Sequence, residues 1–169
     1  MDSQASEGWP LISIKEGEGL ITVKLYNIND SIGDCALPLC YSQFITYENL
    51  DIYGGDQCTC YSVVPVIKAA RLVATIEGES LEGQRLTGRK LLVSGCYKTR
   101  LLRESLGSIS KLELNIPFST YIVVPKDSCC SQEVILKYFI EDTAVISIDR
   151  NKLFISICTL LAYCENIPC

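Results

Sequence analysis

The sequence contains no histidine. This absence excludes a Ser-His-Asp triad, a Cys-His dyad and a histidine-ligated metal centre. The sequence also has no C-x₂-C spacing, so neither a zinc knuckle nor a thioredoxin-like redox motif is expected. The glycines of 78–90 form no phosphate-binding motif, and the neighbours Glu141 and Asp142 should point to opposite faces of a strand rather than form an acid/base pair. We therefore expect no enzyme activity, no cofactor and no metal.

Long apolar runs and clusters of basic residues are also missing. The longest apolar run, 153–164, is too short for the roughly 20 residues of a membrane helix. The net charge is -5 and the Lys and Arg residues are scattered, which argues against a nucleic-acid or acidic-lipid partner. The start, MDSQASEGWP, has no charged region leading into an apolar one, so no secretory signal is expected. We expect a soluble protein with no nucleic-acid and no membrane partner.

Cysteine, by contrast, is abundant, with ten residues in a chain of 169. Because cytosolic thiols are normally kept reduced, this content indicates a place where oxidation is possible. A hydrophobic content of 48% is ample for a packed core, so disulfides are not needed to replace one. The ten candidate disulfide cysteines are Cys35, Cys40, Cys58, Cys60, Cys96, Cys129, Cys130, Cys158, Cys164 and Cys169.

The cysteines allow three interpretations. All ten could form internal bridges, or several, such as Cys158 in an apolar strand, could be small buried hydrophobic residues. The third interpretation, which we favour, is that a subset joins separate copies. It rests on Cys169 as the last residue of the sequence, on the adjacent Cys129 and Cys130, whose side chains should diverge, and on Cys96 on the polar face of its strand. The cysteines expected to form interchain bonds are Cys129, Cys130, Cys169 and Cys96.

Alternation of apolar and polar residues dominates the chain. In 111–118, for example, the residues Leu112, Leu114 and Ile116 share one face of a half-buried strand. Strands are expected over 19–28, 42–53, 62–77, 89–102, 111–118, 119–125, 134–148 and 152–164. The segment 79–87 has a helical alternative, which its glycines weaken. The predicted fold is all-β, as an antiparallel β-sandwich or a barrel-like domain.

Two internal matches bear on the origin of this fold. The segment 31–45 aligns without gaps with 108–122, and 89–96 aligns with 151–158, which sets Cys96 opposite Cys158. Either the chain contains two duplicated hairpin units, or the matches are coincidences among β-rich segments.

The segment 75–125 resembles a known family. The stretch LEGQRLTGRKLLVSG at 81–95, the following Tyr97 and IPFSTYIVVP at 116–125 resemble the SPOCS domain of spore coat and spore envelope proteins from endospore-forming bacteria, chiefly the clostridia and their relatives. The segment 140–157 is similar to the tail that follows this domain. The resemblance implies a structural role in the layers around the spore, where family members often carry a LysM module that has no room here.

The resemblance completes the expected organisation and location. A single domain over 1–169 would comprise an arm at 1–18, a degenerate first repeat at 19–66, the best SPOCS match at 67–148, and a final strand with a cysteine-containing tail at 149–169. Such proteins are made in the mother-cell cytosol without a signal peptide and are exposed when that cell lyses.

The resulting expectation is a structural protein of the spore coat, exosporium or appendage. Its partners would be further copies of itself, in an array or filament joined by interchain disulfides, together with other coat or exosporium proteins. The alternative is a monomeric, internally bridged binding module that docks on a coat scaffold or a glycan.

Overall fold

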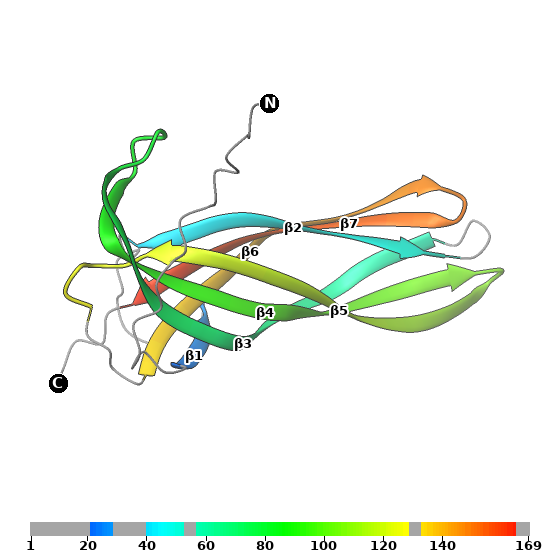
Figure 1. The fold of residues 1–169 in the computed structure, drawn as a ribbon. Coiled ribbons are helices and arrows are strands. Elements are labelled where there is room, and N and C mark those ends of the chain that lie inside the picture. Colours follow the sequence, from blue (N-terminus) through cyan, green and yellow to red (C-terminus); the bar gives the residue numbers. More distant parts are fainter. Residues whose placement is uncertain (1–20, 29–39, 53–56, 129–132, 165–169) are drawn as a thin grey trace, which may run out of the picture.

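The computed structural model describes residues 21–28, 40–52, 57–128 and 133–164 (Figure 1). Its regular elements are strands: β1 (Thr22–Asn27), β2 (Tyr41–Asp51), β3 (Gln57–Glu79), β4 (Arg85–Ser105), β5 (Ser108–Val123), β6 (Glu133–Asp149) and β7 (Lys152–Cys164). The all-β fold predicted from alternation is confirmed. The segments 111–118 and 119–125, expected as separate strands, form the single strand β5.

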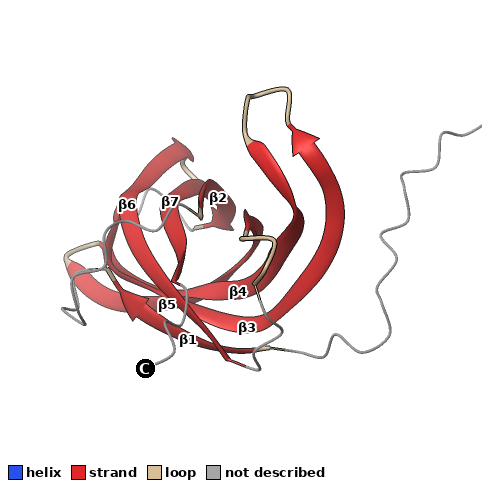
Figure 2. Ribbon diagram, turned by 90° about the vertical axis from the view of Figure 1, so that its left-hand side faces the viewer, coloured by secondary structure: helices blue, strands red, loops and turns tan. Residues whose placement is uncertain are grey.

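The strands form two sheets that pack face to face as a β-sandwich (Figure 2). One sheet has the order β1-β6-β7-β2 and the other the order β3-β4-β5. Their strand pairs are antiparallel except for β1 and β6, which run parallel. At one side, the Ile21 amide donates a hydrogen bond to the Ala70 carbonyl oxygen at 3.1 Å. No strand ladder joins the two sheets among the described residues, so the structure is a sandwich rather than a closed barrel.

The core lies between the sheets and is built from the apolar half of each alternating strand. Its largest fully buried hydrophobic side chains are Tyr97, Leu91, Leu101, Ile116, Ile122, Leu136, Ile155, Ile157 and Leu161. The Tyr97 hydroxyl lies 2.7 Å from the Thr159 hydroxyl, which links β4 to β7 across the sandwich. Burial raises the pKa of Tyr97, so this hydroxyl stays protonated and able to donate.

Proline and glycine occupy specific places in the three-stranded sheet. Pro65 lies in β3 and Pro117 in β5, and both are edge strands, where a missing amide hydrogen is tolerated. Gly95 lies in the central strand β4, where an added Cβ would be 2.2 Å from the Val66 carbonyl oxygen and 2.9 Å from Phe118. Only glycine permits this close approach of β3 and β4.

The helical alternative over 79–87 is wrong. Residues 80–84 form the turn between β3 and β4, in which the Gly83 amide donates to the Ser80 carbonyl oxygen. Gly83 has φ +80° and Gly88 has φ +86°, which are incompatible with a right-handed helix.

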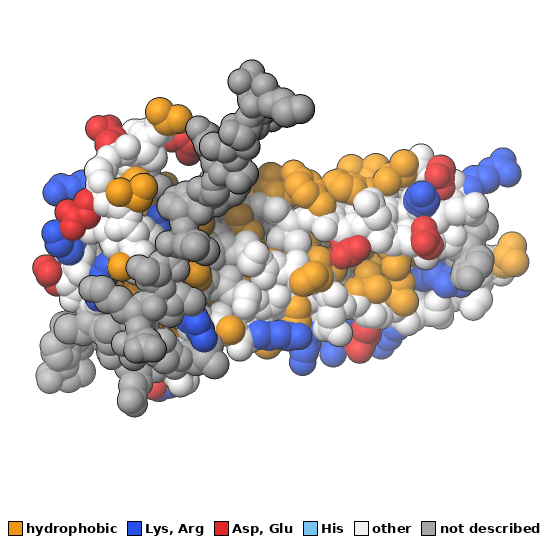
Figure 3. All heavy atoms as spheres, in the orientation of Figure 1, with side chains coloured by type: hydrophobic (Ala, Val, Ile, Leu, Met, Phe, Trp, Pro, Cys, Tyr) orange, Lys and Arg blue, Asp and Glu red, His pale blue; other side chains and the backbone are white. Residues whose placement is uncertain are grey.

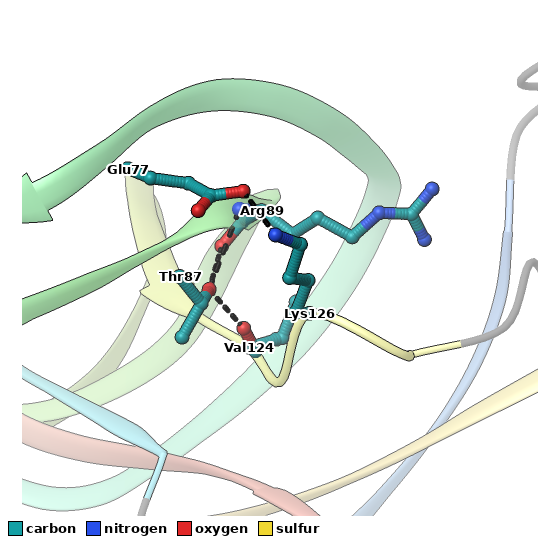
Figure 4. A network of polar contacts seen from close by, with 5 residues as sticks. All are labelled: Glu77, Thr87, Arg89, Val124 and Lys126. Atoms are coloured by element: carbon teal, nitrogen blue, oxygen red, sulfur yellow. Dashed lines mark hydrogen bonds and ion pairs between the residues drawn. The ribbon is translucent and has the colours of Figure 1, made fainter.

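The part of the β3–β4 hairpin near its turn is joined to the end of β5 by a polar network (Figure 4). The Thr87 hydroxyl donates to the Val124 carbonyl oxygen and accepts from the Arg89 amide. Lys126 Nζ lies 2.6 Å from a Glu77 carboxylate oxygen. Because both charged groups are exposed, the hydroxyl bridge contributes more to the geometry than the ion pair does.

The turn between β4 and β5 contains a strained residue. Leu106 is fully exposed and has φ 48°, a left-handed conformation that costs a non-glycine residue about 1–2 kcal/mol. Asparagine adopts this conformation more readily, so Leu106→Asn should raise the free energy of unfolding by about 0.5–1 kcal/mol. The matched control is Leu81→Asn, since Leu81 is equally exposed at the β3–β4 turn without a positive φ. Urea titration of both variants should show stabilisation at position 106 alone.

The segments matched within the sequence lie in opposite sheets. Segment 89–96 belongs to β4 and 151–158 largely to β7, while the described part of 31–45 belongs to β2 and 108–122 to β5. The matched segments also pair correspondingly, β4 with β5 and β7 with β2. The strands occur in a different order along the chain, however, and duplication therefore stays a prediction.

Candidate assembly surface

The strand β2 is an edge of the four-stranded sheet; its charged residues are Glu48 and Asp51, and it has no lysine, proline or bulge. Natural edge strands are commonly protected against pairing with another chain by lysine, proline or a bulge. Among the described edge strands, β1 contains Lys24, β3 contains Pro65 and register shifts, and β5 contains Lys111 and Pro117. The eleven residues of β2 include no lysine, arginine, proline or glycine, and its register with β7 is unbroken. This edge therefore offers a regular template for another strand.

The hydrogen bonds at the two ends of β2 show which of its amide and carbonyl groups point toward β7 and which point away from it. The Tyr163 amide donates to the Cys40 carbonyl oxygen, and the Ile52 amide donates to the Asn151 carbonyl oxygen. In an antiparallel pair, hydrogen-bonded positions alternate. The even-numbered residues of β2 therefore bond to β7, and the odd-numbered residues direct their amide and carbonyl groups to the outer side of the strand.

Part of this outer side is approached by the other sheet. The Ser42 and Thr120 hydroxyls lie 2.7 Å apart, and the Phe44 and Phe118 ring centres are separated by 5.6 Å. These contacts bring β5 close to the first residues of β2. The part of the edge most open to a partner is therefore the second half of the strand, from Ile45 to Asp51.

An apolar surface lies next to this open edge on the outer face of the four-stranded sheet. Ile45 is 51% exposed and Tyr47 is 57% exposed, and the Tyr47 ring stacks on Phe154 of β7 at 5.2 Å. Phe139 and Ile146 of β6 are also exposed. Figure 3 shows hydrophobic side chains gathered over β2 and β7 along the upper side of the molecule. An apolar face beside an open edge gives a second strand both hydrogen bonds and side-chain contact.

A small polar cluster lies within this apolar face. The Gln43 side-chain amide donates to a Glu141 carboxylate oxygen at 2.7 Å, and the Cys158 thiol donates to the same oxygen at 3.2 Å. The expectation that Glu141 and Asp142 point to opposite faces is wrong. The register shift between Ile140 and Asp142 inserts an extra residue, so that Asp142 is paired with Cys158, the same residue that is hydrogen-bonded to Glu141.

The carboxylate controls the acidity of the thiol. The hydrogen bond to Glu141 raises the pKa of Cys158, since it stabilises the protonated thiol, and burial and the nearby charge act in the same direction. The hydrogen bond from Gln43, followed by that from Cys158, lowers the pKa of Glu141. Glu141 therefore stays ionised and keeps Cys158 less reactive than an isolated surface thiol.

Replacing this carboxylate should activate Cys158. In Glu141→Gln the pKa of the thiol falls, so a larger fraction is thiolate at pH 8 and alkylation by iodoacetamide should be several-fold faster. Asp142→Asn is the control, because Asp142 makes only the last and smallest contribution to the pKa of Cys158. Alkylation can be followed at each cysteine by peptide mass mapping. Equal rates in both variants and the parent protein would contradict control by Glu141.

The structure places six of the ten candidate cysteines. Cys40, Cys58, Cys60, Cys96, Cys158 and Cys164 lie within the described residues, and free thiols among them include Cys60, Cys96 and Cys158. The expected interchain cysteines Cys129, Cys130 and Cys169 lie outside the described residues, as does Cys35.

Cys96, expected on the polar face of its strand and as an interchain cysteine, lies on that face but is buried. It has the predicted strand face, because Ser94 and Lys98 on the same face are exposed, but Cys96 itself is only 6% exposed. Its cross-strand neighbours are Val66 and Pro117, and close packing of the three strands leaves little access to the thiol. Burial in the folded protein argues against Cys96 as an interchain cysteine.

Cys158 and Cys60 lie in different surroundings. Cys158, considered as a buried hydrophobic residue, is partly exposed on the outer face. Cys60 packs against the core from β3, and burial raises the pKa of its thiol. Among the described residues, no group of three or more Cys, Asp or Glu side chains is arranged to hold a metal ion.

Comparison with known proteins gives no family. The chain matches no protein-family model, no curated protein and no solved structure. The resemblance of 75–125 to the SPOCS domain therefore stays a prediction. In the part of the chain that the structure describes, no helix has the length and apolarity needed to cross a membrane.

Sequence reasoning centred on the cysteines and did not identify the edge of β2 as a functional surface. A signal was present, since 41–51 alternates regularly and contains no lysine, arginine, proline or glycine. That signal has meaning only when the strand is known to be at an edge. Strand order depends on contacts between distant segments, which the alternation of one strand does not specify.

Proposed function

We propose that this protein is a self-assembling structural subunit of the spore surface, belonging to the coat, the exosporium or an appendage. Copies join through the open edge of β2, and interchain disulfides then make the assembly permanent. The observation that carries this proposal is the regular edge from Ile45 to Asp51, which has no lysine, proline or bulge and lies beside an exposed apolar face. The spore location is supported by the resemblance of 81–95 and 116–125 to the SPOCS domain.

The symmetry of the β2 contact means that an extended assembly needs a second kind of contact. Pairing of β2 with β2 of a second copy is isologous, because the same surface is used on both sides, and it closes as a two-fold pair. A filament or sheet then requires a second kind of contact. Cys129, Cys130 and Cys169 supply it in this proposal, since a disulfide forms a bond that can resist mild reduction. The β2 edge thus makes pairs, and the disulfides link the pairs.

Oxidation also gives the assembly an order. Thiols in the mother-cell cytosol are kept reduced, so pairing through β2 precedes covalent linkage. After the cell lyses, oxidation locks contacts that the fold has already positioned. The buried and carboxylate-bound thiols, Cys96 and Cys158, are the described cysteines that we expect to react last.

The experiment is electron microscopy and electrophoresis of the purified, oxidised protein. We expect filaments or sheets by microscopy and a ladder of cross-linked species on non-reducing gels. Reductant should dissolve the large assemblies into two-fold pairs rather than monomers, as measured by analytical ultracentrifugation. Dispersed particles with a single monomer band under oxidising conditions would overturn the proposal and favour an internally bridged binding module.

A further inference from the structure

A groove of about 440 Å³ lies on the three-stranded sheet, away from the β2 edge. The groove is lined by two neighbouring rows of side chains, each of which runs across β3, β4 and β5. The side chains of one row are small: Ala69, Ser94 and Ser119. Those of the next row are large: Arg71, Leu92 and Tyr121. The small row forms the floor, and the large row forms a wall. The groove is therefore a consequence of side-chain size at positions in register.

The groove combines an apolar lining with positive charge. Leu92 and Tyr121 are exposed, Tyr121 to 48%, although both are large hydrophobic residues. Lys90 Nζ lies 4.2 Å from the centre of the Tyr121 ring, and Arg71 is exposed on the same wall. These features suit an apolar peptide segment that is accompanied by carboxylates.

The sequence supplies such a segment, and Ile21, the first described residue after it, lies next to the groove. The Ile21 amide is bonded to the carbonyl oxygen of Ala70, and Ala70 lines the groove. Residues 9–14 have the sequence WPLISI, and 1–20 contain four carboxylates, Asp2, Glu7, Glu16 and Glu18, against one lysine, Lys15, which gives a net charge of -3. The six intervening residues 15–20 can span about 20 Å when extended.

We propose that residues 9–14 dock in this groove of their own chain. The apolar residues of the segment cover Leu92 and Tyr121, and the carboxylates of 1–20 lie near Arg71 and Lys90. Docking removes exposed apolar surface from the three-stranded sheet. The proposal concerns a different face from the β2 edge and does not depend on the proposed function.

The single tryptophan of the sequence, Trp9, is the probe. We expect blue-shifted emission from Trp9 in the full-length protein and protection from quenching by acrylamide. Ser94→Glu and Ser119→Glu fill the floor of the groove and repel an acidic segment, and each should raise the quenching constant several-fold. Both side chains are exposed, so circular dichroism should be unchanged. Asn115→Glu, on an exposed outward position of the same strand as Ser119, is the control and should retain protection.

The remaining outcomes overturn the proposal. Trp9 emission typical of free tryptophan in the parent protein would show that the segment is not docked. Protection that persists in both groove variants would place Trp9 elsewhere. Protection that increases with protein concentration would show that the groove belongs to another copy. Repeating the series in the Ile45→Lys background, where the β2 contact is removed, separates failure of docking from failure of assembly.

Discussion

Ile45→Lys is expected to weaken the pairing of reduced protein copies about 100-fold or more. Ile45 is half-exposed at the open part of the β2 edge, and its amide and carbonyl groups face away from β7. Lysine here replaces an apolar contact residue beside the paired edge with a charge that must be desolvated when the partner strand is added, which costs several kcal/mol. Natural proteins place lysine on edge strands for this reason. Sedimentation equilibrium under reducing conditions measures the change.

The matched control is Ile109→Lys. Ile109 is 70% exposed on β5, so the same change of charge and hydrophobicity is made away from β2. We expect this variant to pair as the parent protein does, and both variants to have unchanged circular dichroism. If Ile109→Lys weakened pairing as much as Ile45→Lys, net charge rather than the β2 edge would be responsible. If neither variant changed pairing, the edge would not be the contact.

Gly95→Ala is expected to lower the free energy of unfolding by about 3 kcal/mol or more. The added Cβ would lie 2.2 Å from the Val66 carbonyl oxygen and 2.9 Å from a Phe118 ring carbon. The nearer atom belongs to the backbone of the paired strand, so no rotation of a side chain relieves the overlap. The strands β3 and β4 must separate, which disrupts their ladder near the middle of the sheet. Guanidinium titration with reductant present measures the loss.

Ser94→Ala provides the comparison for this variant. Ser94 is the preceding residue of β4 and its side chain is exposed, so its replacement should change stability by less than about 0.5 kcal/mol. A Gly95→Ala protein as stable as Ser94→Ala would mean that β3 and β4 are not held at the distance described. It would also remove the explanation for the burial of Cys96.

The strands were predictable because their information is local. The alternation over 152–164 is directly visible, and β7 has these bounds. Division of β5 at 118/119 was wrong, because Pro117 interrupts a sequence pattern but not an edge strand. The helical alternative at 79–87 was wrong because the sequence does not show that Gly83 adopts a positive φ.

The candidate surface depends on information that single strands do not contain. Alternation placed Cys96 on the correct face, but its burial depends on Val66 and Pro117 in neighbouring strands. The bulge at Glu141 shifts one side chain between faces and has no clear signature in the residues around it. Likewise, the openness of β2 follows from strand order, which is set by pairing with β7 more than a hundred residues later.

The pairing of early with late strands also determines the order in which the two sheets can fold during synthesis on the ribosome. The β3-β4-β5 sheet consists of neighbours in sequence and can form as soon as it emerges. β1 and β2, by contrast, must wait for β6 and β7, since Thr22 pairs with Glu133 and Tyr41 with Ala162. A nascent or truncated polypeptide lacking β7 has no anchored β2 to offer to a neighbour. If copies pair through β2 as proposed, that pairing is possible only after β7 has been synthesised.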